Sequence, residues 1–103
     1  MNASDLSKLF KKVESPIVVF FWKPFFGPCE MFMPIFSDAS LKLADKVVFC
    51  SLNIEKYAEA RDKFMITDVP IVIAFKKNAE IGRQSGSMFS DSFMNWLGAT
   101  LGL

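Results

Sequence analysis

The side chains best suited to covalent chemistry in this chain are its two cysteines, Cys29 and Cys50. The sequence has no histidine, which excludes Ser-His-Asp triads, Cys-His pairs and histidine-ligated metals. Two thiolates are also too few for a zinc site made of four cysteines. The sequence leaves covalent chemistry possible at a thiol, a carboxylate, a lysine or a hydroxyl. We expect neither a metal nor another cofactor.

Cys29 ends the stretch Phe26-Gly27-Pro28-Cys29, which separates two different apolar patterns. Residues 17–22 before it are continuously apolar and rich in β-branched and aromatic side chains, as in a central strand covered on both faces. A helix is predicted from Pro28, because proline is tolerated in the first turn. The sequence therefore places Cys29 at a strand-to-helix junction.

Cys50 lies in the middle of a second predicted strand, residues 47–54, and we interpret it as a core thiol. A bond between Cys29 and Cys50 is not expected, because a helix start and a mid-strand position would need close, aligned Cβ atoms. Cys29 by itself has two interpretations. It is either a buried structural thiol, or a monothiol that forms mixed disulfides.

The other elements alternate in type along the chain. Leu6, Leu9, Phe10 and Val13 form one apolar stripe of a first helix, capped by Asn2 or Ser4. Further helices are predicted at residues 56–63 and 89–101, the last capped by Ser90 or Asp91, and further strands at 71–75 and 80–84. The alternating part favours parallel strands joined by helices, and the closing strand pair an antiparallel hairpin. We predict a single α/β domain over residues 1–103, a four-stranded mixed sheet with helices on both faces.

Composition and charge restrict the partners. The chain is 51% hydrophobic and contains 12 Phe, which supports a sizeable core. A net charge of +1 provides no field for holding nucleic acid or an anionic membrane. The polar start has no apolar run of signal-peptide length, and no run could span a bilayer. We therefore expect a cytoplasmic protein with a protein or peptide partner.

Residues 21–31, Phe-Trp-Lys-Pro-Phe-Phe-Gly-Pro-Cys-Glu-Met, resemble the thioredoxin family's Phe-Trp-Ala-x-Trp-Cys-Gly-Pro-Cys-Lys-Met. The resemblance continues through Pro34, residues 52–55, residues 66–70 and Gly86, so it covers nearly the whole chain. It implies a thioredoxin fold whose N-terminal strand is missing or vestigial. The activity class that it implies is thiol-disulfide oxidoreductase.

The same resemblance implies that this activity is altered. In the family the first cysteine of the motif attacks and the second resolves the mixed disulfide. Phe26 occupies the attacking position here, and only the resolving Cys29 remains. Phe20 stands where the family commonly has a buried Asp that assists proton transfer. Ser51 and Glu30 stand where it often has Lys, and a nearby carboxylate favours the neutral thiol. Dithiol cycling is therefore not expected.

A substrate groove is also implied by the resemblance. Val69-Pro70 matches the family's cis-proline, although by itself it indicates an ordinary trans-proline that opens a strand, because few X-Pro bonds in folded proteins are cis. The groove would be formed by Phe25, Phe26, Gly27, Pro28, Val69, Pro70 and Gly86. Phe25 and Phe26 either form an exposed apolar patch or tuck under their loop.

Several functions stay open on the sequence, and enzymatic activity is the less favoured outcome. The first is a redox-inactive module that holds an extended protein segment. The second is a monothiol enzyme or carrier that uses Cys29, and the third an oxidoreductase role through a partner's thiol. The missing N-terminal strand would also leave residues 47–54 at a sheet edge, where a homodimer with Cys50 near its symmetry mate is expected.

Overall fold

Strand β1 is the centre of the fold, and the other elements are arranged around it. The computed structural model describes residues 3–103. In chain order the elements are α1 (Ala3–Lys12), β1 (Ile17–Trp22), α2 (Gly27–Lys42), β2 (Val48–Asn53), α3 (Glu59–Lys63), β3 (Ile71–Lys76), β4 (Ala79–Ser85) and α4 (Ser90–Leu101). This is the predicted order of helices and strands.

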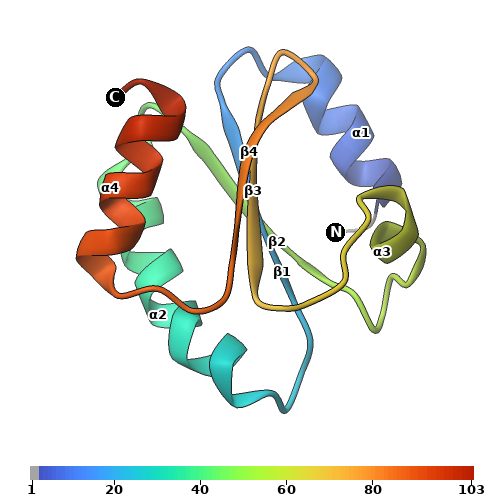
Figure 1. Cartoon of the computed structure of the whole chain (residues 1–103). Coiled ribbons are helices and arrows are strands. Elements are labelled where there is room, and N and C mark those ends of the chain that lie inside the picture. Colours follow the sequence, from blue (N-terminus) through green and yellow to red (C-terminus); the bar gives the residue numbers. More distant parts are fainter. Residues whose placement is uncertain (1–2) are drawn as a thin grey trace.

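The strands form a four-stranded sheet in the order β2-β1-β3-β4. Helices α2 and α4 cover one face, and α1 and α3 cover the other (Figure 1). The predicted α/β class and four-stranded mixed sheet are thus confirmed. Within residues 3–103 no strand precedes α1, so β2 is an edge strand, as expected. None of the described helices is long and apolar enough to cross a bilayer.

The direction of β3 differs from the prediction. β1 and β2 are parallel, but β3 is antiparallel to β1, with Ile71 opposite Phe21. β2 ends with Asn53 opposite Trp22, so β3 begins at the end of the sheet where β2 finishes. A parallel crossover must return along the whole sheet, and the five-residue α3 spans only about 7.5 Å.

The predicted helix caps were also wrong where the structure tests them. Ser4 lies inside the first turn of α1, and Asn2 lies outside the described residues. The N-cap of α4 is Phe89, without a side-chain cap; its carbonyl accepts the N–H of Phe93 at 2.9 Å. Ser90 lies one residue inside the helix, and Asp91 contributes a negative charge to the first turn.

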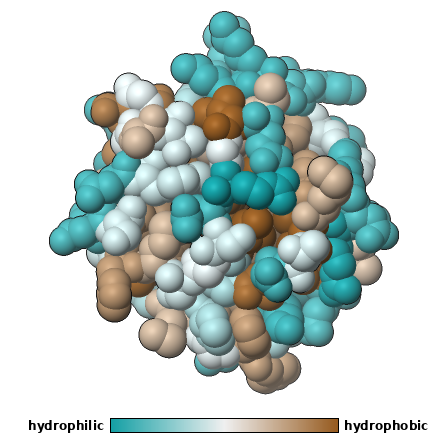
Figure 2. All heavy atoms as spheres, in the orientation of Figure 1, coloured by the Kyte–Doolittle hydropathy of each residue, from teal (hydrophilic) through white to brown (hydrophobic). Residues whose placement is uncertain are grey.

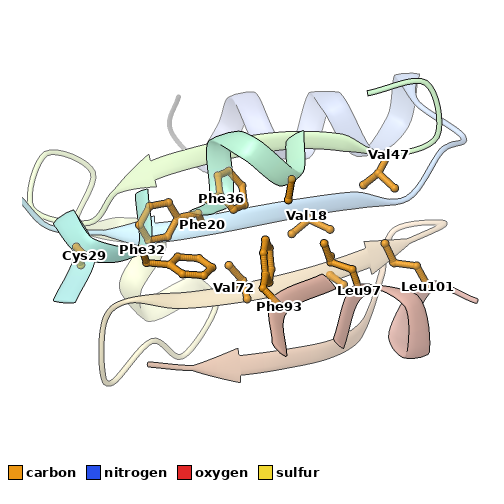
Figure 3. Packing of buried hydrophobic residues seen from close by; sticks show 12 residues of the cluster. Val18, Phe20, Cys29, Phe32, Phe36, Val47, Val72, Phe93, Leu97 and Leu101 are labelled. Atoms are coloured by element: carbon orange, nitrogen blue, oxygen red, sulfur yellow. The ribbon is translucent and has the colours of Figure 1, made fainter. Parts of the chain in front are cut away.

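Each face of the sheet has its own core. β1 supplies both, since alternate side chains of a strand point to opposite faces: Val19 and Phe21 pack toward α1, whereas Val18 and Phe20 pack toward α2 and α4. The core on the α2 side runs as a row along the sheet, with Cys29 at one end beside Phe32 (Figure 3). This core fixes the start of α2 beneath the loop that carries the motif.

Candidate functional site

The candidate site is the loop between β1 and α2, with the first turn of α2. Phe26 has extended backbone (φ −123°, ψ 113°) and is the N-cap residue of α2. Its carbonyl accepts hydrogen bonds from the N–H groups of Cys29 and Glu30, both at 3.1 Å. Pro28 fits because it lies where a helix needs no backbone donor. Cys29 therefore lies at a junction between a strand and a helix, as predicted.

Cys29 is buried, with 1% of its surface exposed. Burial is the main cause that raises the pKa of this thiol above its usual value. A backbone hydrogen bond at Lys23 and the Lys23 charge lower the pKa, while the Glu30 carboxylate raises it further. Glu30 thus acts in the expected direction, but desolvation is the larger effect. The thiol stays protonated at neutral pH.

Phe25 and Phe26 lie in different environments. Neither the expectation of an exposed apolar patch nor that of burial under the loop therefore holds for both residues. Phe25 has a positive φ of 57°, and its side chain is 97% exposed. Phe26 is half-buried, and the Lys23 ammonium lies 4.4 Å from the centre of its ring. In the orientation of Figure 2, apolar spheres protrude at the lower end, where Figure 1 shows the β1–α2 loop.

The loop before β3 lies beside this motif. The Val69–Pro70 peptide bond is cis, and Pro70 is buried. The Gly86 N–H donates to the Pro70 carbonyl at 2.7 Å. Gly86 has a φ of +85°, a conformation that favours glycine. This bond ties the end of β4 to the start of β3.

A hollow of about 230 Å³ separates the motif from this loop. Its lining residues are Lys23, Phe26, Ile54, Arg61, Thr67, Asp68 and Val69. Of the predicted groove residues, the structure brings Phe26 and Val69 together here. Gly27, Pro28 and Gly86 are exposed and do not line it.

Phe25 lines a different hollow, of about 340 Å³. Its lining residues are Trp22, Lys23, Pro24, Phe25, Cys29, Glu30 and Met33. The predicted groove residues thus do not line one common hollow, and Lys23 lines both hollows. Cys29 lines this second hollow, so a thiol reagent that entered it would approach Cys29.

Sequence reasoning missed the charged residues of the first hollow. Asp68 lies within residues 66–70, a segment that resembles the family's cis-proline segment. The resemblance was therefore the signal that could have pointed to Asp68. Lys23 stands at a position where the family pattern has Ala, and that departure was the available signal. Arg61 gave none, because only the placement of α3 brings it to the motif.

Cys50 lies on the opposite face of the sheet from Cys29, half-buried against the α1 and α3 side. Both cysteines are free, as expected. The Cys50 Sγ lies 4.0 Å from the Val18 carbonyl oxygen. Burial raises the pKa of Cys50 to about 12, so it is a poor nucleophile. Within residues 3–103 no group of His, Cys, Asp or Glu side chains could hold a metal ion.

Beneath the motif the structure has an aromatic cluster. Phe20 is 1% exposed; its ring lies 5.3 Å from that of Phe32, edge to face, and 5.2 Å from that of Phe36. No polar or charged residue is buried among the described residues, and Ser51 is exposed. No buried carboxylate or lysine in the described chain therefore exchanges a proton with Cys29.

Comparisons with known proteins agree on one family. A family model described as thioredoxin matches residues 1–99. Thioredoxin of Rickettsia typhi is 28% identical over 102 residues, which are 97% of each chain. The chloroplastic thioredoxin Y of Oryza sativa subsp. japonica is 29% identical over 98 residues, 95% of this chain and 58% of that protein. The X-ray structure of Fasciola hepatica thioredoxin has a TM-score of 0.89 and 25% identity, covering 96% of this chain and 94% of that one.

Proposed function

The chain belongs to the thioredoxin family, and from this premise we propose that it is a member without dithiol redox cycling that binds an extended protein segment. The observation that carries the proposal is the pair Phe26 and Cys29. The position of the attacking thiol holds a phenylalanine, and the remaining thiol is 1% exposed. A thiolate is the form that attacks a disulfide, and the raised pKa of Cys29 disfavours it.

Binding is supported by the surface beside the motif. Phe25 is 97% exposed, and the partly exposed Met33 lines the same hollow; contiguous exposed apolar surface of this kind often marks a binding site. The hollow of about 230 Å³ beside Phe26 and Val69 is open to the surface. An extended segment lying there could pair with the backbone of the loop that holds Pro70, as in β-strand addition.

The redox half of the proposal is tested by insulin reduction with dithiothreitol and by turnover with a thioredoxin reductase. We expect no activity in either assay, and measurable turnover contradicts the proposal. The Phe26→Cys variant is the informative comparison. Continued inactivity would mean that Phe20, Ser51 and Glu30 also disable the site, whereas recovery would mean that Phe26 alone does.

The binding half is tested by capturing proteins on immobilised protein and identifying them by mass spectrometry. Phe25→Asp should remove the bound proteins, because a charge replaces the exposed ring. Leu41→Asp is the matched control, since Leu41 is 80% exposed but lies near the far end of α2. Equal capture by both variants contradicts binding at the groove.

A monothiol role for Cys29 is the second candidate, because Cys29 lines the hollow of about 340 Å³; burial raises the pKa of this thiol, and the Lys23 charge offsets part of that rise. In this role Cys29 would form a mixed disulfide with a client or with glutathione. Iodoacetamide labelling of the native protein between about pH 7 and pH 9 decides it. Labelling only in denaturant rejects the monothiol role. Labelling of Cys29 in the native protein would favour the monothiol role over the binding module. It would also agree with an oxidoreductase role that acts through a partner's thiol.

We also propose a cytoplasmic location. The support is chemical: two unpaired cysteines suit a reducing compartment, where thiols are kept reduced. Thioredoxin Y of Oryza sativa is named as chloroplastic, so relatives occur elsewhere. Imaging of a fluorescent fusion in the native host tests this location, and signal confined to an organelle contradicts it.

A further inference from the structure

We propose that the groove selects an acidic extended protein segment, with a glutamate side chain seated in the hollow between Lys23 and Arg61. This inference rests on the proposed function and names the chemical class of the partner. Three observations carry it: the Lys23 ammonium lies over the Phe26 ring, Arg61 lines the same hollow, and apolar side chains line it too. We call the charged lining residues the rim of this hollow and the apolar ones its floor.

The first observation concerns the pair Lys23 and Phe26. Each departs from the family pattern, which has Ala and Cys at these positions, and in this chain the two side chains touch. The Lys23 ammonium lies 4.4 Å from the centre of the Phe26 ring, within the range of a cation–π contact. The residue that replaces the attacking thiol therefore holds a positive charge beside the hollow that both residues line.

The second observation is the freedom of both cations to take a ligand's carboxylate. Lys23 and Arg61 line the same hollow. Within residues 3–103 the ion pairs are Lys42–Asp38 and Arg83–Glu80, so neither rim cation is paired with a described carboxylate. Arginine and lysine are the usual partners of carboxylates in recognition.

Asp68 is the opposing charge on this rim. It lines the hollow but forms no ion pair with a described cation. Two cations against one carboxylate leave the rim with an excess of positive charge, which favours an acidic side chain over a basic one. Asp68 would repel that side chain, and its removal should therefore strengthen binding.

The floor of the hollow distinguishes a glutamate from a bare anion. Phe26, Ile54 and Val69 contribute apolar surface, on which the methylene groups of a glutamate can pack. The space of about 230 Å³ suits one side chain rather than a folded ligand. An inorganic anion would meet the charges but leave the apolar floor uncovered.

The test measures fluorescence anisotropy with two short fluorescein-labelled peptides. Both carry the same leucine and phenylalanine residues, with glutamates in one and lysines at the same positions in the other. We expect the glutamate peptide to bind about tenfold or more tightly than the lysine peptide. The difference should shrink as salt is raised from about 0.05 to 0.5 M, because salt screens exposed charges.

Variants of both signs locate the effect. Lys23→Glu and Arg61→Glu should each weaken binding of the glutamate peptide about tenfold, and Asp68→Asn should strengthen it. Lys12→Glu is the matched control, because it makes the same change of charge at the exposed end of α1. Equal weakening by Lys12→Glu would mean a general charge effect and would overturn the assignment to this hollow.

The outcomes separate the two proposals. Equal affinity for both peptides, lost in Phe25→Ser, overturns the acidic preference and leaves groove binding in place. No binding of either peptide by the wild-type chain contradicts the proposed function, and the acidic preference falls with it. Tighter binding of the lysine peptide would overturn the preference outright.

Discussion

Phe26 and Phe20 are apolar residues at positions where the thioredoxin family has reactive ones. Phe26 replaces the attacking cysteine and forms a platform for Lys23. Phe20 replaces the buried aspartate and joins an aromatic cluster with Phe32 and Phe36. Each substitution removes a proton-transferring or nucleophilic group and adds apolar contact. At both positions the described contacts are therefore apolar or cation–π packing contacts.

The environment of Phe20 predicts that the family's aspartate no longer fits. Phe20→Asp should cost more than about 4 kcal/mol of unfolding free energy, since truncating a buried Phe costs roughly 3–5 kcal/mol and burying a carboxylate adds to it. Phe20→Leu, the apolar control, should cost only about 1–2 kcal/mol. Urea unfolding measures both. Similar costs for the two variants would mean that the site still accommodates a carboxyl group.

Cys50 predicts a loss of stability at high pH. Burial raises its pKa from a usual value of 9.0 to about 12 in the folded chain, so the unfolded thiol ionises first. The stability that the neutral thiol contributes is therefore complete below about pH 9 and is lost as the pH rises toward 12. Cys50→Ala should remove this dependence, so the stability of wild type relative to Cys50→Ala should fall by roughly 1.4 kcal/mol between pH 7 and pH 10. A constant difference would contradict the burial of this thiol.

Single elements explain where pattern reasoning failed. The continuous apolar run of β1 and the proline at the start of α2 were sufficient to place both elements, because these signals are local. The direction of β3 was not predictable from the alternation of helices and strands. It depends on the end of the sheet at which the segment containing α3 returns the chain. The N-cap of α4 was missed because Phe89 caps through its backbone alone.

The contact between β4 and α4 allows a direct test of how closely these elements pack. A Cβ on Gly82 would lie 2.8 Å from Cγ2 of Thr100 and 3.8 Å from Cζ2 of Trp96. Gly82→Ala should therefore destabilise the protein by about 1–3 kcal/mol, as measured by thermal or urea unfolding. Adding Thr100→Ala should recover part of the loss, since the two sites are coupled.

Gly98→Ala is the matched control for this prediction. Gly98 lies in α4, the same helix as Thr100, and a Cβ added there would meet the Leu103 carbonyl oxygen at 4.0 Å. Alanine there should stabilise α4 by about 0.5–1 kcal/mol, because glycine is a poor helix former. Destabilisation at Gly98, or no effect at Gly82, would contradict the packing described.

On the scale of the whole molecule, β2 leaves an open edge of the sheet. The N–H groups of Val48 and Ile54 donate to the carbonyls of Pro16 and Trp22. In a parallel ladder this alternation directs the backbone groups of Phe49, Ser51 and Asn53 away from β1. Such a row of unpaired backbone groups favours pairing with another chain, so the homodimer through residues 47–54 stays a proposal.

This edge predicts a weak dimer that depends on protein concentration. Sedimentation velocity should show a rising sedimentation coefficient as the protein is concentrated. Ser51→Pro should reduce the association, because it removes an outward N–H while proline is tolerated at sheet edges. Thermal unfolding verifies that the variant is folded. Monomeric behaviour of the wild-type chain at high concentration would contradict the dimer.

The sequence by itself determined the family, the order of helices and strands, the central position of β1 and the loss of the attacking cysteine. These follow from local patterns and from residue identity at fixed spacing. Tertiary structure decided which side chains meet: that Arg61 joins Lys23 at one hollow, that Phe25 is exposed while Phe26 is half-buried, and that burial dominates the pKa of Cys29. Side-chain contacts, burial and the distances between charges depend on how segments far apart in the sequence pack together. No local sequence pattern determines that packing.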